Sequence, residues 1–285
     1  MPELPEVETT MRLVRPHVVG RAIERVDATW PRTVGGDAKA FARAVRGARI
    51  VRAWRRAKWI VFDLEGGSKG AARHILVHLR MTGRLVVEPS DAPPPRWWKV
   101  ALHLDDGRAL WFLDVRKFGR VHARAARPAE FDELGPEPLS DEFDGAWLHA
   151  ALLARRRALK PLLLDQSFLA GLGNIYVDES LHAVGLHPLA DSARTTREQA
   201  ERLAAAIKRV LAAAIEREGS SFDAFYRTPE GNPGSYQDQF LVYGREGEPC
   251  RACGASIRKF VVGQRGTHAC PRCQPAPRGR AVKKK

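Results

Sequence analysis

The sequence predicts an α+β protein, and three observations carry that prediction. Residues up to about 125 contain short apolar or alternating runs, which are typical of strands. Residues 146–218 instead carry apolar side chains at the spacing of amphipathic helices. Four cysteines, all after residue 249, form two Cys-x2-Cys pairs and indicate a small metal-binding module. We therefore expect a strand-rich part, a helical part and a metal-binding part, in that order.

The strand-rich part, which we place at 1–130, contains five apolar runs separated by turn-forming residues. The expected strands cover 50–54, 59–64, 74–79, 100–104 and 109–113. Only the start departs from this pattern, since residues 5–14 can form a helix with Pro5 in its first turn. Residues 90–96 include three consecutive prolines, so we expect an extended loop there.

An acidic stretch follows the strands. Residues 130–144 contain seven acidic residues and two prolines, a composition typical of a linker or a domain boundary. We place the linker at 131–145. In a chain this basic, we expect an acidic segment to be solvated and to face away from any polyanionic partner.

The helical domain is expected at 146–235. Its helices are predicted over 146–157, 159–165, 175–183 and 196–218, with a glycine-rich segment at 169–174 between two of them. At the start of the longest helix, Thr196 and Gln199 have the spacing of a capping box, and Gly219 follows its end.

The cysteines fit a four-cysteine zinc site within a module at 236–275. Cys250-x2-Cys253 and Cys270-x2-Cys273 are separated by sixteen residues, and each pair can place two thiolates on one side of a metal. Between them we expect a hairpin with its tip at 263–266, which includes Arg265. Since the protein fills all four ligand positions, one structural Zn²⁺ is expected, with iron as the alternative. Residues 276–285 form a basic tail, too polar to pack and expected to be disordered.

Charge narrows the class of partner. The chain has 47 basic and 33 acidic residues, a net charge of +14, which favours nucleic acid over an anionic membrane surface. No stretch approaches about 18 uncharged apolar residues, and the N-terminus lacks a basic region followed by an apolar run. We therefore expect no membrane association and no secretory signal. A metal site in place of disulfides indicates a reducing compartment.

The first residues suggest a nucleophile. Removal of Met1 would leave Pro2 as a secondary amine with an unperturbed pKa of about 7.7–8.0, so a useful fraction is neutral near pH 7. A neutral secondary amine that attacks a sugar carbon gives an iminium ion without a second deprotonation. Glu3 beside it could transfer protons. Taken alone, however, a proline in this place only begins a chain.

Several motifs together change that interpretation. They are Pro2–Glu8 (PELPEVE), Arg55–Lys58 (RRAK), His78–Gly83 (HLRMTG), Asp114–Gly119 (DVRKFG), Leu134–Leu139 (LGPEPL), Gly171–Tyr176 (GLGNIY) and the cysteine module. In this order they make the chain resemble the formamidopyrimidine-DNA glycosylase (Fpg/MutM) family along nearly its full length. Leu4 favours the purine-lesion branch, because the endonuclease VIII-like branch typically has glycine there.

The resemblance implies a fold and an activity. The fold is an N-terminal β-sandwich with flanking helices, a helix–two-turns–helix domain and a C-terminal β-hairpin zinc finger. The activity is that of a bifunctional DNA glycosylase and AP lyase, which excises 8-oxoguanine and formamidopyrimidines from double-stranded DNA. The abasic strand is then cleaved by β,δ-elimination through a Schiff base at the N-terminal proline. We expect a monomer in the cytoplasm of a bacterial-type cell, associated with the nucleoid.

Two other functions stay open at this point. An endonuclease VIII-like glycosylase would act on oxidised pyrimidines, but Leu4 and the zinc hairpin argue against it. A noncatalytic, zinc-dependent DNA-binding protein fits the charge and the cysteines equally well. That alternative leaves Pro2, Glu3 and Lys58 unexplained.

The resemblance also assigns roles to residues. Pro2 is the nucleophile, Glu3 the general acid/base, and Lys58 a catalytic cation near the sugar and phosphate of the lesion. The side chains that fill the space left by the flipped base are Met81, Arg116 and Phe118. Because an apolar wedge and a planar cation can replace lost stacking, these residue types suit that role.

The remaining assignments concern the DNA backbone. Asn174 and Arg265 correspond to the phosphate clamp of the family, and Arg265 is counted among the catalytic as well as the DNA-binding residues. Helix capping is a second possible role for Asn174. His78 and Tyr243 are weaker candidates for backbone contact, with a core histidine and a packed tyrosine as the alternatives. Residues 228–235 occur where the family has a lesion-capping loop, and their glycines and prolines predict a loop in any case.

Overall fold

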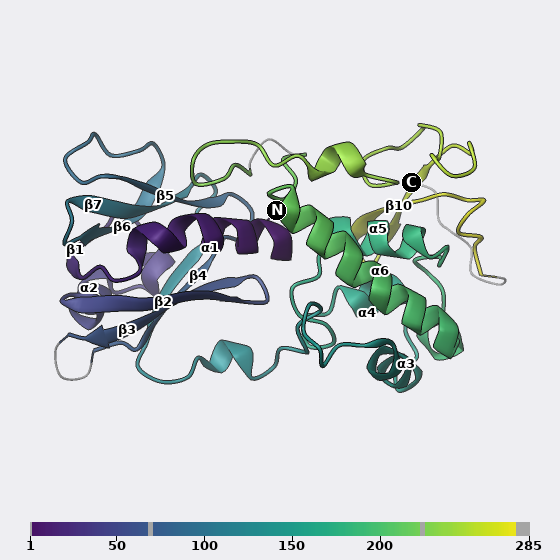
Figure 1. The fold of residues 1–285 in the computed structure, drawn as a ribbon, viewed down its shortest axis with the longest axis horizontal. Coiled ribbons are helices and arrows are strands. Elements are labelled where there is room, and N and C mark those ends of the chain that lie inside the picture. Colours follow the sequence, from purple (N-terminus) through teal and green to yellow (C-terminus); the bar gives the residue numbers. More distant parts are fainter. Residues whose placement is uncertain (1, 68–70, 223–225, 278–285) are drawn as a thin grey trace. The chain divides into compact units, whose positions relative to one another are not determined.

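The computed structural model describes residues 2–67, 71–222 and 226–277 (Figure 1). The chain divides into two compact units, Met1–Asp132 with Arg217–Ser235, and Glu133–Glu216 with Tyr236–Lys285. The predicted disordered tail lies, from residue 278 onward, outside the described residues. Among the helices described, none is both long and apolar enough to cross a membrane.

The first unit is a sandwich of two antiparallel four-stranded sheets (Figure 1). One sheet has the order β1–β6–β7–β5, with strands Ile23–Ala28, Trp98–Leu104, Arg108–Asp114 and Gly83–Pro89. The other has the order β2–β3–β4–β8, with strands Ala48–Arg56, Trp59–Gly66, His74–His78 and Arg120–Arg124. A single buried core joins apolar side chains of both sheets, including Ile50, Phe62 and Phe112. The predicted β-sandwich is confirmed.

Helices flank the sandwich. Helix α1 (Leu4–Val18) contacts β2 and β3 of one sheet and β5 of the other, and it buries Val7, Met11 and Val14 in the shared core. Helix α2 (Ala38–Val45) begins at Asp37, whose carboxylate accepts a hydrogen bond from the Ala40 N–H at 2.9 Å. Two short 3₁₀ helices, η1 (Pro31–Val34) and η2 (Ala129–Phe131), complete this unit.

Four elements of this unit were absent from the prediction: β1, β5, β8 and α2. The expectation from the apolar pattern of a single helix at the start of the chain was therefore wrong, whereas the flanking helices that the family resemblance implies are present. Three of these elements bury few residues: β1 buries only Ile23, β8 only Val121, and α2 only Phe41 and Val45. Such segments have a weak apolar pattern, because their position is fixed mainly by neighbours that are distant in sequence.

The second unit contains the expected helices. They are α3 (Gly145–Leu153), α4 (Leu159–Leu163), α5 (Asn174–Ala183) and α6 (Arg197–Glu216), with 3₁₀ helices η3 (Ser192–Arg194) and η4 (Tyr236–Gln239). The capping box before α6 is present: the Thr196 N–H donates to Gln199 Oε1 at 3.0 Å, and the Gln199 N–H donates to Thr196 Oγ1 at 3.2 Å. Leu203, Ile207 and Leu211 of α6 are fully buried.

The finger hairpin consists of β9 (Arg258–Val262) and β10 (Arg265–Ala269). Its turn is shorter than predicted, since Val262 pairs with Arg265 and only Gly263 and Gln264 lie between the strands. Both turn residues have positive φ, 54° and 62°, as a tight two-residue hairpin favours. Arg265 therefore opens a strand beside the tip and is exposed.

Residues 217–235, which we expected at the end of the helical domain, belong to the first unit. Two contacts account for this difference. The buried carboxylate of Glu6 accepts a hydrogen bond from the Ser220 N–H at 2.9 Å, and the Arg84 guanidinium donates to the Thr228 carbonyl at 3.3 Å. Both partners are distant in sequence from the segment, so local composition could not reveal them.

The acidic stretch is more than a solvated linker. Phe131 is 7% exposed and packs edge-on against Trp54, with ring centroids 6.0 Å apart. Phe143 is fully buried in the second unit. Each end of the stretch is therefore anchored in a core, while most of the acidic side chains between them stay at the surface.

Candidate active site and nucleic-acid interface

Pro2 and Glu3 are buried where α1 begins. Glu3 is the N-cap residue, and its backbone N–H donates to Glu6 Oε2 at 2.8 Å within a capping box. Because Glu6 is itself only 2% exposed, this bond is shielded from competing water. The backbone that carries the candidate nucleophile and proton carrier is therefore held in one position.

Lys58 lies in the two-residue turn between β2 and β3, since Arg56 pairs with Trp59. The preceding Ala57 has φ 52°, a left-handed conformation that costs an alanine roughly 1–2 kcal/mol. Lys58 is only 9% exposed, which is unusual for a lysine. A strained turn and a buried ammonium group are features that concentrate at functional sites.

An ion pair ties this turn to α1. Arg55 Nε donates to Glu8 Oε2 at 2.8 Å, and Arg55 also donates to the carbonyl of Ala57 at 2.9 Å. Glu8 is in the same helical turn as Glu6. The helix that begins at Pro2 and Glu3 and the strand that ends at Lys58 are thus joined directly.

His78 ends β4 and packs edge-on against Trp59, with ring centroids 4.7 Å apart. Burial, followed by the charges of Arg80 and Lys58, lowers the pKa of His78 to about 3. Its Nδ1 accepts a hydrogen bond from the Arg80 N–H at 3.0 Å, which leaves the ring proton on Nε2. His78 is therefore a neutral hydrogen-bond donor, and the half-buried side chain is not the apolar core histidine of the alternative interpretation.

The three predicted gap-filling residues lie on two connected loops. Met81 is in the turn between β4 and β5, and Arg116 and Phe118 are in the loop between β7 and β8. The hydroxyl of Thr82 donates to the fully buried Asp114 carboxylate and accepts from the Arg116 N–H at 3.1 Å. One hydroxyl and one carboxylate therefore hold both loops together.

The β7–β8 loop presents its side chains to solvent. Phe118 is 46% exposed, and the Arg116 guanidinium lies 4.8 Å from the centre of its ring. Asp114 also accepts from the Gly119 N–H at 2.7 Å. A Cβ on Gly119 would come within 2.3 Å of the Phe112 ring, so this close approach requires glycine. An exposed aromatic ring on a rigid loop suits insertion between bases better than core packing.

In the second unit, Asn174 and the finger hairpin meet at one carbonyl. Asn174 Nδ2 donates to the Gly266 carbonyl at 3.0 Å and lies 3.4 Å from the Tyr243 hydroxyl. Gly266 follows Arg265 directly, so the two residues of the predicted phosphate clamp are close together. Asn174 does not cap its helix, because the N-cap residue of α5 is Gly173.

A buried ion pair that we did not predict supports this arrangement. Lys160 and Asp178 are both fully buried, and Lys160 Nζ donates to Asp178 Oδ1 at 2.7 Å and to the Gly266 carbonyl at 3.0 Å. The other oxygen of Asp178 accepts from the His268 N–H at 2.9 Å. Two backbone groups of β10 are thus fixed by one ion pair.

Glu179 has a similar role one residue later. Its carboxylate accepts the backbone N–H groups of 241, 242 and 243 at 2.7–3.0 Å. Burial raises its pKa, against the effect of these hydrogen bonds. The bonds fix the chain that carries Tyr243, whose ring packs edge-on to His268 with centroids 4.9 Å apart. The sequence carried only a weak signal, two adjacent acids in a helix that also contains Asn174, Ser180 and His182. Acids are rarely buried unless they are paired.

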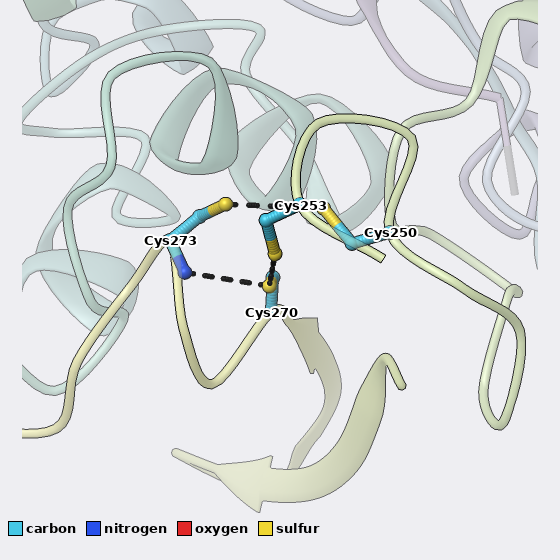
Figure 2. Close-up of side chains that lie close together, drawn as sticks. All are labelled: Cys250, Cys253, Cys270 and Cys273. Carbon is cyan, nitrogen blue, oxygen red and sulfur yellow. Dashed lines mark hydrogen bonds between the residues drawn. The ribbon is translucent and has the colours of Figure 1, made fainter. Parts of the chain in front are cut away.

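The cysteines converge from the two knuckles (Figure 2). All four Sγ atoms lie within 4.8 Å of one another, with 3.4 Å between Cys253 and Cys270 and 3.9 Å between Cys250 and Cys273. A tetrahedral zinc site with Zn–S bonds of about 2.3 Å places its sulfurs about 3.8 Å apart, so these thiolates fit zinc. The four cysteines bind one structural Zn²⁺, which holds the hairpin beside Asn174.

A β-sandwich that carries an N-terminal Pro-Glu pair, followed by a helical unit that ends in a four-cysteine finger, is the architecture that the resemblance to DNA-repair glycosylases implies. Family models match in the same order: the formamidopyrimidine-DNA glycosylase N-terminal domain at residues 1–121, its H2TH domain at 134–225, and a zinc finger found in FPG and IleRS at 247–276. The chain belongs to the formamidopyrimidine-DNA glycosylase family and is therefore an enzyme, a glycosylase with AP lyase activity.

Known relatives agree over the whole length. The formamidopyrimidine-DNA glycosylase of Symbiobacterium thermophilum is 45% identical and that of Xanthomonas campestris 43%, over 99% and 96% of this chain and 92% and 100% of theirs. The crystal structure of the MutM (Fpg) protein of Thermus thermophilus superposes with a TM-score of 0.84 at 42% identity, covering 96% of this chain and 98% of that one. A Lactococcus lactis Fpg (MutM) complex with N7-benzyl-Fapy-dG DNA gives 0.87 at 34% identity, covering 96% and 100%.

Proposed function

We propose that this enzyme excises oxidised purines, 8-oxoguanine and formamidopyrimidines, from double-stranded DNA and then cleaves the abasic strand. The observation that carries the proposal is the buried Pro2–Glu3 pair, whose backbone is fixed at the start of α1 by Glu6. The relatives solved with lesion-containing DNA support a substrate of this kind. The endonuclease VIII-like alternative is less well supported: one Lactococcus lactis Fpg (MutM) structure contains DNA with an oxidised pyrimidine, but the family models and the named relatives that match are those of formamidopyrimidine-DNA glycosylases.

The chemistry begins at the Pro2 nitrogen. Once Met1 is removed, the neutral secondary amine attacks C1′ of the flipped nucleotide and the bond from C1′ to the damaged base breaks. The proline nitrogen then loses its proton, the C1′–O4′ bond of the sugar ring breaks with protonation of O4′, and an iminium ion forms. Glu3 donates and accepts the protons that these steps require. Successive β- and δ-eliminations then release the two phosphates that flank the sugar. Removal of an initiator methionine is normal before a residue as small as proline.

Lys58 stabilises negative charge on the sugar–phosphate during these steps. Its buried ammonium group interacts more strongly with a phosphate than an exposed lysine would, because the local dielectric is low. His78, a neutral donor beside it, can hydrogen-bond the same backbone without adding charge. Met81, Arg116 and Phe118 fill the space left by the flipped nucleotide.

The second unit contributes backbone contacts. Asn174 and Arg265 bind one phosphate; the support for this is that Asn174 donates to the carbonyl of Gly266, the residue that follows Arg265. Tyr243, whose hydroxyl lies 3.4 Å from Asn174 Nδ2, contacts the same DNA backbone. We also propose that the enzyme acts as a monomer, without membrane association, in the cytoplasm of a bacterial-type cell and on nucleoid DNA.

Borohydride trapping on a duplex that carries 8-oxoguanine tests the nucleophile. We expect a covalent adduct that maps to the N-terminal peptide and that decreases sharply when Met1 is retained or when Pro2 is replaced by glycine. Glu3→Gln should lose base excision while DNA binding survives. An adduct that maps to Lys58, or excision of oxidised pyrimidines only, would contradict the proposal.

The proposed insertion of Phe118 between bases can be tested against a matched control variant in the same loop. Phe118→Ala should weaken excision from a lesion duplex more than cleavage at a preformed abasic site, where less stacking must be broken. Val115→Ala removes a side chain of similar exposure, 48% against 46%, and should change neither reaction. Equal losses on both substrates would exclude a wedge role for Phe118.

A further inference from the structure

The carboxylate of Glu6 joins two parts of the first unit that are more than two hundred residues apart in sequence. Its Oε2 accepts from the Glu3 N–H at 2.8 Å, while its Oε1 accepts from the Ser220 N–H at 2.9 Å and lies 3.4 Å from the Ser220 hydroxyl. Glu6 and Ser220 are 2% and 5% exposed. One buried side chain therefore contacts both the candidate catalytic residue and the segment Arg217–Ser235.

The backbone around this contact has no spare room. Gly219 has φ +78°, and a Cβ there would come within 2.8 Å of Glu6 Cγ and Oε1. Gly234 lies across from it, and a Cβ on Gly234 would come within 2.4 Å of the Gly219 carbonyl oxygen. Any side chain at these glycines must displace either Glu6 or the segment.

The segment makes further contacts with α1 and with strand β5. Tyr226, 3% exposed, places its hydroxyl 3.5 Å from the Glu6 carbonyl, and the Thr10 hydroxyl donates to the same carbonyl at 2.8 Å. Beyond Tyr226, the segment is attached to strand β5 through Arg84 and the Thr228 carbonyl. Two points of the segment, Ser220 and Thr228, are thus bonded to elements next to site residues: α1, whose N-cap residue is Glu3, and β5, which follows the Met81 turn.

We propose that Glu6 is a positioning residue that couples the segment Arg217–Ser235 to the Pro2–Glu3 pair. When the Ser220 N–H donates to Oε1 of Glu6, the plane of the carboxylate is fixed, and Oε2 accepts from the Glu3 N–H and holds that backbone in place. If the segment shifts, Glu6 rotates and Glu3 is released. The position of the segment therefore controls base excision, the step in which Glu3 acts; this inference rests on the proposed role of Glu3.

The coupling can be measured with a double-mutant cycle of Glu6→Gln and Gly219→Ala. The first substitution places an NH₂ group where a backbone N–H must donate, and the second pushes the segment away from the carboxylate. Excision is followed under single-turnover conditions, at saturating enzyme, on an 8-oxoguanine duplex and separately on an abasic duplex. Circular dichroism of each variant reports whether the sandwich is folded.

We expect each single variant to slow excision at least tenfold while it slows abasic-site cleavage less than threefold. The double variant should be no slower than the slower single variant, because both remove the same contact. Glu24→Gln, the same substitution at an exposed position of strand β1, should match the unmodified enzyme. Glu6→Asp, which keeps the charge, should recover part of the rate and shift the pH profile of excision.

Three outcomes would overturn the coupling. They are multiplicative effects in the double variant, normal excision by Gly219→Ala, and equal slowing on both substrates in a folded variant. Failure of the proposed function appears differently, as a lack of excision and of a trapped adduct with the unmodified enzyme. The two failures are therefore distinguishable.

Discussion

Two hairpins in this protein present a cation in or beside a two-residue turn, and they are held in opposite ways. The β2–β3 hairpin presents Lys58, which is buried, from strands whose apolar side chains belong to the core of the sandwich. The β9–β10 hairpin presents Arg265, which is exposed, from five-residue strands with a small core of their own. The first hairpin is held by the hydrophobic core and the Arg55–Glu8 ion pair, whereas the second is supported by a metal site and by the fully buried Lys160–Asp178 ion pair.

The difference indicates what each cation requires. A buried ammonium group must be fixed where charge develops, and a large core supplies that rigidity. An exposed guanidinium that binds a phosphate can be carried by a smaller hydrophobic core, provided that the strand from which it projects is fixed in position. The five predictions below test this contrast, from the largest expected effect to the smallest.

Zinc removal should have the largest effect. Chelation, or Cys253→Ser, should unfold residues 250–273 and abolish DNA binding, because zinc binding contributes roughly 10–16 kcal/mol of apparent free energy in small fingers. The sandwich should stay folded. All seven tryptophans precede the finger, so the near-ultraviolet tryptophan signal should persist while gel-shift binding is lost. Normal lesion cleavage by the apoprotein would show that the finger is dispensable.

Lys160→Met should have the second-largest effect, on the stability of the second unit. It leaves the Asp178 carboxylate buried without its cation, which typically costs about 3–5 kcal/mol. Urea unfolding of the zinc-loaded variant should show a loss of this size, with zinc still bound and DNA affinity reduced. Asp178→Asn, which leaves the buried Lys160 ammonium without its anion, should show a loss of similar size. A variant as stable as the parent would rule out the ion pair as the support of β10.

Arg265→Ala should affect binding alone. Loss of one charge-assisted hydrogen bond to phosphate should weaken affinity about 10- to 100-fold and reduce the slope of log affinity against log salt by about one. Stability should be unchanged, since the side chain is exposed. Arg258→Ala, also exposed on the same hairpin, is the control. An unchanged salt slope would mean that Arg265 touches no phosphate.

Low pH should lower the free energy of unfolding through His78, which pairs with Trp59 of the β2–β3 hairpin. Its folded pKa of about 3 lies below the unfolded value of about 6.5, so the unfolded chain binds more protons between these pH values. The stability contributed by neutral His78 is therefore present above pH 6.5 and is lost as pH falls toward 3. His78→Gln should reduce the pH slope of unfolding free energy by up to one proton in that window. An identical slope in the variant would contradict a half-buried histidine that stays neutral in the folded protein.

The smallest effect should come from the turns themselves. Ala57→Gly relieves a left-handed alanine and should raise the unfolding free energy by at most about 1 kcal/mol, and Gln264→Gly should do the same in the other hairpin. Only Ala57→Gly should slow excision, because its flexibility loosens Lys58. Equal activity in both variants would show that the strained turn does not position the lysine.

The sequence itself determined much of this protein. The Cys-x2-Cys spacing specified the zinc site, since two knuckles can close only around a tetrahedral metal. Apolar periodicity gave the central strands and α6, because segments buried along their length carry a strong pattern. The order of the motifs gave the family, and with it the roles proposed for Pro2, Glu3 and Lys58.

The tertiary structure decided what depends on partners distant in the chain. Edge and surface elements such as β8 and α2 were missed, since they bury only one or two side chains each. The buried contacts of Glu6 with Ser220, and of Lys160 with Asp178 and Gly266, also have no local pattern. A charged group can be buried only where folding brings its partner to it. For that reason, the groups that hold the site residues in place were visible only in the folded chain.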